Sequence, residues 1–226
     1  LFIGKIETWD EIKNDLSDEM PIIRFPKYDG CSNVTKGYEW HEFINNHDPI
    51  QNPHTPKLSD LWTIIFTSGT TGNPKGVMLT YQAIDGIKVV LDDPNNPLGI
   101  KHTGNNDFIS YLPLNHIFER VVIEWCSFRY GGTISFVESI EKFGQNLKSV
   151  QPHVFAAAPR VWTKLQMGIL SKFPQKRLDF LLKIPVFSSI LKKLIRKGLG
   201  FSKVRVTVSG SAPMPVELIE WFRKVG

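Results

Sequence analysis

The sequence predicts an α/β fold in which a mostly parallel sheet carries helices on both faces. From Leu61 onward, strand-like and helix-like segments alternate at least five times, the pattern expected when a helix crosses over the sheet after each strand. The strand-like segments are short runs rich in β-branched and aromatic residues, which is typical of strands buried on both faces. In such sheets, ligands bind at the carboxyl ends of the strands.

Residues 1–60 are expected to form a partial, loop-rich N-terminal segment of the same domain as residues 61–226. The strands expected there are 1–3 and 21–25, and the expected helices are 7–19 and a short amphipathic one around 40–44. Thr8 is the expected N-cap of the first helix, because Glu11 follows it at the capping-box spacing.

The second part, 61–226, is expected to hold the alternating core. Its expected strands are 61–65, 108–112, 133–137, 153–157 and 204–208. Its expected helices are 81–91, 117–129, 140–150, one that begins at Pro159, and 215–225. Thr80 is the expected N-cap of the first of these helices, and Gly131-Gly132 ends the second. Three candidate binding segments then lie at strand ends: 67–76, 113–116 and 209–213.

The segment 67–76 contains four hydroxyl side chains, three glycines and Lys75. Glycines let backbone N–H groups approach an anion closely, hydroxyls add donors, and the lysine supplies a positive charge. The segment is therefore expected to bind a polyphosphate. It is not a Walker A motif, because Pro74 precedes Lys75 and Gly76 follows it, so the loop cannot enter a helix at the lysine.

Residues 66–76 instead resemble the phosphate loop of the adenylate-forming superfamily, which comprises acyl-CoA synthetases, luciferases and the adenylation domains of peptide synthetases. The resemblance implies that the chain is part of the large N-terminal domain of such an enzyme. It implies that the loop holds the β- and γ-phosphates of ATP through Thr67, Ser68, Gly69, Thr70, Thr71, Gly72 and Lys75. A loop hydroxyl would contact Mg²⁺, and the sequence does not indicate which one.

The second segment ends in His116. Taken alone, a histidine at a strand–helix junction is more often a helix-terminal or core residue than a functional one. Leu112-Pro113-Leu114-Asn115-His116 resembles the L-P-x-x-H motif of the superfamily, and the following Ile117–Arg120 resembles its long-chain acyl-CoA synthetase branch. The resemblance implies that His116, a candidate catalytic residue with Lys75, orients the carboxylate of the acid. Glu119 and Arg120 are interpreted as structural, an exposed helix pair being equally consistent with them.

The third segment consists of small residues, Ser209, Gly210, Ser211, Ala212 and Pro213. Taken alone it is an ordinary strand–turn–helix joint. It resembles the S-G-[GS]-A-P segment of the superfamily, which implies that its backbone lines the adenine and acyl-adenylate site. Arg160 and Trp162 are candidates for the border of an acyl or CoA channel, although core and helix-face roles are preferred.

The resemblance implies ATP-dependent activation of a long-chain fatty acid to acyl-AMP, followed by thioesterification to CoA. Fatty acid, ATP and CoA are the implied substrates. The superfamily's aromatic-Gly-x-Thr-Glu segment, its ribose-binding aspartate and its C-terminal domain with the adenylation lysine have no counterpart here. The chain therefore resembles a central fragment of a longer enzyme, and it is expected to need the remainder of its own chain for turnover.

Charge is distributed unevenly along the sequence. Residues 1–60 carry six Lys/Arg and eleven Asp/Glu, whereas residues 160–205 carry twelve Lys/Arg and a single acidic residue, Asp179. With no nucleic-acid module in the sequence, nucleic acid is excluded as the partner of the basic part. Peripheral contact with an anionic membrane through 178–200 is the alternative to a solvated helix that covers the core.

The cellular setting is expected to be cytoplasmic, at most peripheral to the inner face of a membrane. Cys31 and Cys126 lie far apart, which favours reduced thiols and disfavours a metal site. No leader segment is expected, and no stretch reaches the roughly 18 uncharged apolar residues of a membrane span.

Two alternative functions stay open at this point. One is an adenylation domain that hands the acyl group to a carrier-protein thiol instead of CoA. The other is a non-catalytic module that binds membranes or a partner through its basic surface.

Overall fold

The computed structural model describes residues 1–3, 6–25, 34–67, 73–93 and 104–226. By its internal contacts the chain divides into two compact units, residues 1–55 and 56–226.

Three two-residue strands organise the first unit, and they pair in parallel in the order β1-β2-β3. Its elements are β1 (Phe2–Ile3), α1 (Ile6–Ile12), β2 (Ile23–Arg24), β3 (Tyr38–Glu39) and α2 (Trp40–Asn45). A small core gathers Ile3, Trp9, Ile22 and Val34. The predicted strands and the predicted short helix around 40–44 are confirmed.

The predicted helix over 7–19 is wrong in its extent. Helix α1 ends at Ile12, and Thr8 lies inside it instead of capping it. After Ile12 the chain contains short polar residues that bond to nearby backbone groups and so compete with helix formation. The Ser17 hydroxyl, for example, accepts a hydrogen bond from the backbone N–H of Glu19 at 3.3 Å.

The second unit begins with an antiparallel hairpin of β4 (Leu61–Thr67) and β5 (Lys75–Thr80). The prediction that 61–65 is a buried strand of the parallel sheet is therefore wrong. The connection between the two strands is too short for a crossover, so they pair antiparallel. Ile65 is buried, whereas the exposed fractions of Phe66 and Met78 are 65% and 72%. The loop runs into a strand at Lys75, as its difference from a Walker A motif predicts.

The four-stranded sheet that follows is wholly parallel, with the order β7-β6-β8-β9. Its strands are β6 (Asp107–Ser110), β7 (Thr133–Phe136), β8 (Val154–Ala157) and β9 (Val206–Ser209). The helices are α3 (Tyr81–Leu91), the π-helical η1 (Glu119–Trp125), α4 (Cys126–Tyr130), α5 (Phe143–Val150), α6 (Pro159–Leu170), α7 (Gln175–Leu182), α8 (Pro185–Leu199) and α9 (Val216–Val225). The predicted βα alternation is confirmed from residue 107 onward, and α3 starts after Thr80 as predicted.

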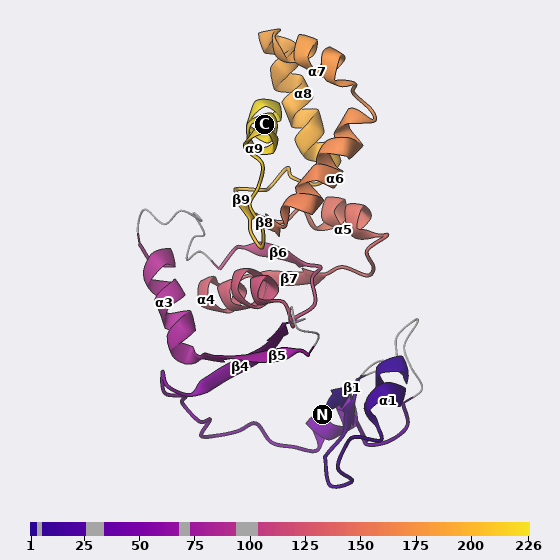
Figure 1. Ribbon diagram of the computed structural model, residues 1–226, viewed down its shortest axis with the longest axis vertical. Coiled ribbons are helices and arrows are strands. Elements are labelled where there is room, and N and C mark those ends of the chain that lie inside the picture. Colours follow the sequence, from indigo (N-terminus) through magenta and orange to yellow (C-terminus); the bar gives the residue numbers. More distant parts are fainter. Residues whose placement is uncertain (4–5, 26–33, 68–72, 94–103) are drawn as a thin grey trace. The chain divides into compact units, whose positions relative to one another are not determined.

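Successive residues of the central strands face opposite sides of the sheet, and helices cover both sides (Figure 1). On one face, Phe108 and Val154 pack with residues of α3, η1 and α4. On the other face, Ile109 and Phe155 pack with residues of α5, α6 and α9. This arrangement confirms the predicted fold class.

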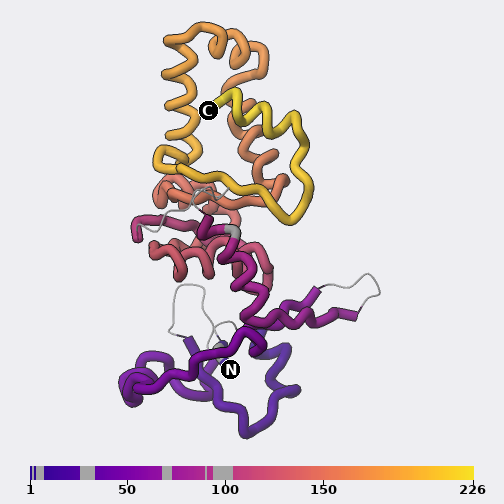
Figure 2. The backbone as a smooth tube through the Cα atoms, turned by 90° about the vertical axis from the view of Figure 1, so that its left-hand side faces the viewer, coloured from indigo at the N-terminus to yellow at the C-terminus, as the bar shows by residue number. Residues whose placement is uncertain are grey.

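The C-terminal helices form a further core beyond the sheet. Ile169 of α6, Leu178 of α7, Leu191 and Ile195 of α8, and Val225 of α9 are buried against one another. The backbone trace shows α6, α8 and α9 grouped at this end of the second unit (Figure 2). Gly200 ends α8 in the left-handed region at φ +83°, and a Cβ there would lie 2.4 Å from the carbonyl oxygen of Leu147 in α5.

We expect Gly200→Ala to lower the free energy of unfolding by more than about 1 kcal/mol, because the added methyl meets both a left-handed backbone and a fixed carbonyl. The matched control is Gly198→Ala, two residues earlier inside α8, where a Cβ would meet nothing within 4 Å. That change should raise stability by about 0.5–1 kcal/mol through helix propensity. Urea unfolding of both variants measures the contrast, and equal effects would contradict the role of the close approach.

Candidate functional site

Two of the three predicted segments follow strands of the parallel sheet, so they leave the sheet at the same edge. The segment 113–116 comes after β6 and the segment 209–213 comes after β9, with β8 between the two strands. The hydroxyl of Tyr111 donates a hydrogen bond to the carbonyl oxygen of Ala156 in β8 at 3.2 Å. This bond ties the loop after β6 to the middle strand.

The side chain of Phe118 brings the two segments into contact. A Cβ built on Gly210 would lie 2.5 Å from Cε2 of the Phe118 ring, so the ring occupies the space where any other residue would carry a side chain. The next residue, Ser211, has φ +67°, one of two non-glycine residues with positive φ among those that the structure describes. Backbone strain of this kind is found at binding sites more often than elsewhere.

His116 is half-buried and lies at the start of the helix that contains η1. Its Nδ1 accepts a hydrogen bond from the backbone N–H of Phe118 at 3.2 Å, and its carbonyl oxygen accepts from the N–H of Arg120 at 3.2 Å. The side chain therefore acts as a cap for the helix. Since Nδ1 accepts, the neutral ring carries its proton on Nε2, which has no hydrogen-bond partner among the described residues. Capping thus fixes the ring and leaves one donor available.

Glu119 is the residue that sequence reasoning missed. It was interpreted as structural, with an exposed helix pair as the equally consistent alternative, and its exposed fraction of 1% excludes that alternative. Its carboxylate lies near the Ser110 hydroxyl and the backbone N–H groups of Tyr111 and Leu112, yet neither oxygen makes a hydrogen bond of good geometry. Burial raises the pKa of Glu119 above its ordinary value near 4.5, and the neighbouring donors offset that effect in part. Burial of the Tyr111 side chain, together with the charge of Glu119, raises the pKa of Tyr111 to about 12.

Arg120 has a structural role and links two parts of the second unit. Its guanidinium contacts both carboxylate oxygens of Glu124, at 2.7 and 2.8 Å. The guanidinium carbon lies 4.8 Å from the centre of the Trp62 ring in β4, within the range of a cation–π interaction. Through this contact the hairpin is attached to the helix that follows His116.

The predicted phosphate-binding residues are placed only in part. Ser68, Gly69, Thr70, Thr71 and Gly72 lie outside the described residues. Thr67 and Lys75 are paired neighbours at the end of the hairpin, where the Thr67 hydroxyl is 3.5 Å from the carbonyl oxygen of Lys75. Within the described chain, no hydrogen bond or ion pair joins Thr67 or Lys75 to His116 or to 209–213.

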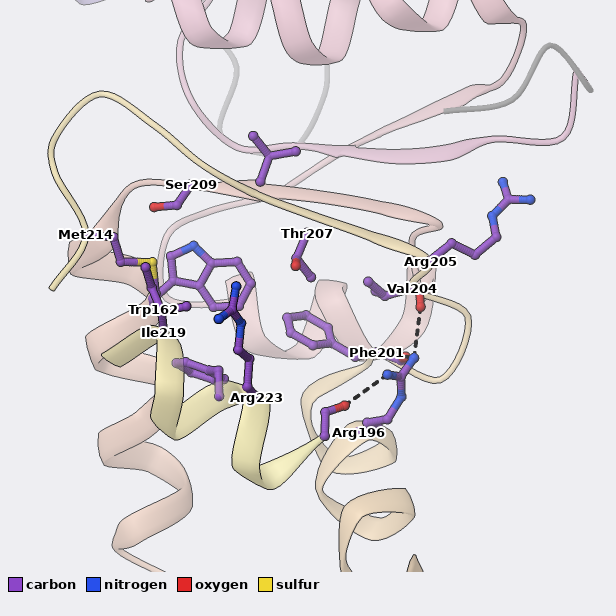
Figure 3. A pocket seen from close by; sticks show the side chains of 13 residues that line it. Trp162, Arg196, Phe201, Val204, Arg205, Thr207, Ser209, Met214, Ile219 and Arg223 are labelled. Carbon is purple, nitrogen blue, oxygen red and sulfur yellow. Dashed lines mark hydrogen bonds between the residues drawn. The ribbon is translucent and has the colours of Figure 1, made fainter. Parts of the chain in front are cut away.

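A cavity of about 580 Å³ lies beside β9, between that strand and α9 (Figure 3). It is lined by Trp162, Arg196, Phe201, Val204, Arg205, Thr207, Val208, Ser209, Met214, Ile219, Phe222, Arg223 and Gly226. Of the predicted site residues, Ser209 alone contributes to it. Trp162 is also part of the core, where its ring nitrogen donates to the carbonyl oxygen of Ala157 at 3.2 Å, so its preferred core role is confirmed.

Among the described residues, no three His, Cys, Asp or Glu side chains gather in a way that could hold a metal ion. In the same part of the chain, no helix is both long enough and apolar enough to cross a bilayer. Arg160 is exposed on α6.

The parallel sheet, the joint at 209–213 and the histidine-capped helix start match the arrangement expected from the resemblance to adenylate-forming enzymes. The model of the AMP-binding enzyme family matches residues 8–226, and the chain belongs to this family. Two solved structures share the fold: the anthranilate CoA ligase AuaEII in complex with anthranoyl-AMP, with a TM-score of 0.67 at 15% identity, and a red-emitting luciferase from Phrixothrix hirtus, with a TM-score of 0.64 at 17% identity. Each match covers 97% of this chain and 37% of the other.

Within the family, the chain is similar in sequence to long-chain acyl-CoA synthetases. The chain is 31% identical over 214 residues to long chain acyl-CoA synthetase 3 of Arabidopsis thaliana, covering 83% of this chain and 31% of that protein. It is 34% identical over 207 residues to long-chain-fatty-acid–CoA ligase 5 of Rattus norvegicus, covering 80% and 30%. The chain thus spans about a third of the length of these relatives.

We expect Glu119→Gln to flatten the dependence of stability on pH. Because the pKa of Glu119 is raised in the folded state, the folded protein binds more protons than the unfolded chain at pH values above about 4.5, and the free energy of unfolding falls as pH rises through this range. The neutral amide removes that loss, so the variant should be at least as stable as the parent at neutral pH.

Urea unfolding between about pH 5 and about pH 8 measures this effect, with Glu220→Gln on the exposed side of α9 as the control. A loss of more than about 1 kcal/mol at every pH would mean that the fold requires the charged carboxylate.

Proposed function

We propose that this chain forms the core of the nucleotide and acyl site of an ATP-dependent long-chain fatty acid–CoA ligase. The observation that carries the proposal is the contact of the Phe118 ring with Gly210, which unites the His116 segment and the 209–213 joint at one edge of the sheet. The family and the long-chain acyl-CoA synthetase relatives support the same reaction. Activity belongs to the longer protein, of which this chain would supply one part.

Each segment has a chemical role in the proposal. The backbone of Gly210–Pro213 offers a surface of small residues against which a flat base can lie. His116 directs its Nε2–H toward a carboxylate oxygen of the acid, since Nδ1 is occupied by the helix cap. The hydroxyls, glycines and Lys75 of the 67–76 loop counter the charge of the β- and γ-phosphates.

The reaction proceeds in two displacements. A carboxylate oxygen of the fatty acid attacks the α-phosphorus of ATP, and the bond to pyrophosphate breaks, which gives acyl-AMP. The thiol of CoA then attacks the acyl carbonyl and AMP leaves. The protein contributes mainly position and charge stabilisation to the first step. Mg²⁺ bound with ATP would neutralise part of the phosphate charge.

We expect His116→Ala in the full-length protein to lower kcat/KM for acyl-AMP formation by about 10- to 100-fold, because the carboxylate loses a positioned donor. His116→Asn separates this role from the cap: asparagine is a good N-cap but does not place a donor where Nε2 lies. The asparagine variant should keep the parent Tm and still lose activity.

Pyrophosphate release measures the rate, with His41→Ala on the exposed side of α2 as the control. Parent activity in His116→Asn would show that His116 serves only as a cap.

Lys75→Ala should raise KM for ATP by about tenfold or more, with little effect on KM for the fatty acid, because the lost charge faces the phosphates alone. Lys57→Ala removes an exposed lysine of the same unit and provides the control. An unchanged KM for ATP would contradict the phosphate role of the loop.

The substrate and the acceptor are tested with the full-length protein, a panel of carboxylic acids, and either CoA or a carrier-protein thiol. Pyrophosphate release that depends on a long-chain acid, with product formed on CoA, is the expected result. Transfer to the carrier thiol alone would identify the alternative adenylation domain, and no release with any acid would leave the non-catalytic alternative.

A further inference from the structure

The exposed side of α8 carries an apolar stripe that the core does not use. Leu191 and Ile195 are buried in the core of the C-terminal helices. Ile190 and Leu194, one position earlier in each pair, have exposed fractions of 53% and 56%, and Phe187 on the same side has 54%. Of the four apolar residues 190, 191, 194 and 195, the structure thus buries two in the core and exposes two.

Two lysines border this stripe. Leu194 lies four positions after Ile190, and Lys197 lies three positions after Leu194, so Lys197 continues the stripe along the helix. Lys193 lies three positions after Ile190 and borders the stripe. Both lysines are exposed, and neither makes an ion pair within the described chain. Apolar residues flanked by lysines that point to solvent are typical of helices that lie in the surface of a membrane.

The other two cations of α8 contact other parts of the chain. The guanidinium of Arg196 donates to the carbonyl oxygens of Phe201, Val204 and Gly226 at 3.2, 2.8 and 3.0 Å. The aliphatic part of Lys192 packs beside Gly226, where a Cβ would be 3.1 Å from that of Lys192. Charge on this helix is thus divided between a structural pair and an exposed pair.

The neighbouring helix α7 presents the same combination. A hollow of about 290 Å³ on it is lined by Lys176, Arg177, Phe180 and Leu181, and the exposed fraction of Phe180 is 64%. Asp179, the one acidic residue in 160–205, is held by Lys224 and Gln175. The basic charge of residues 160–205 is therefore not neutralised by acidic residues of the same segment.

We propose that the exposed sides of α7 and α8 form a surface that docks on an anionic lipid bilayer. Charge complementarity favours a bilayer over a second copy of the chain. A two-fold dimer through this surface would bring together two copies of the same basic patch, and like charges there oppose association. Docking of this kind would keep the ligase next to the membrane in which long-chain acids are dissolved.

Binding of the purified protein to vesicles tests the proposal without ATP, acid or CoA, so that its outcome is independent of the ligase reaction. The protein should sediment with phosphatidylcholine vesicles that contain phosphatidylglycerol, and much less with phosphatidylcholine alone. Lys193→Gln with Lys197→Gln should weaken binding by about tenfold or more, since each lysine near an anionic surface contributes about fivefold. Ile190→Gln with Leu194→Gln should weaken binding by about tenfold.

Two controls keep the test decisive. The double change Lys57→Gln with Lys88→Gln alters the net charge by the same amount, at a residue just before β4 and at one in α3. It should leave binding within about twofold. The Tm of every variant should stay near that of the parent, because all the substituted side chains are largely exposed.

Equal binding by the parent and the α8 variants, or no binding to anionic vesicles, would overturn the proposal. A dimer seen by analytical ultracentrifugation and abolished by the Ile190→Gln, Leu194→Gln pair would overturn it as well, in favour of self-association.

Discussion

The candidate site depends on the absence of a side chain at residue 210. Gly210 leaves the space that the Phe118 ring fills, and this contact holds the joint after β9 against the helix start after β6. The two segments lie far apart in sequence, yet parallel pairing through β8 brings their strands to one edge of the sheet. His116 takes its orientation from the same helix start, where its Nδ1 caps the backbone. The proposed nucleotide-binding surface and the imidazole thus share one support.

Much of this arrangement is readable in the sequence because the parallel sheet has a simple pattern. β8 is buried at all four positions, and a short apolar run before Pro159 indicates such a strand. The hairpin was harder to predict. β4 and β5 are apolar runs like the others, but whether they pair antiparallel depends on the length of the loop between them, and no strand was expected over 75–80. The periodicity of a sequence indicates the type of an element more reliably than it indicates the strand with which that element pairs.

The site residues divide in a similar way. The positions of His116 and of the 209–213 joint after strands were predictable from the order of the elements, whereas the roles proposed for them rest on the resemblance to the superfamily's motifs. The burial of Glu119 was not predictable, because glutamate near a helix start usually faces water, and this burial arises from the packing of η1 on β6. The contact between Arg120 and Trp62 joins elements that no local pattern relates. Tertiary contacts of this kind are beyond a single sequence.

The β4–β5 hairpin has a consequence for the dynamics of the molecule. Its strands pair with each other, and in the described chain neither pairs with the four-stranded sheet. Two-stranded ribbons with exposed apolar side chains are marginally stable by themselves. The hairpin is therefore a cooperative unit of its own, whose amide hydrogens should exchange with solvent by local opening long before those of β6 and β8. Thr67 and Lys75 would thus be carried by a part of the unit that opens at a lower free-energy cost than the parallel sheet.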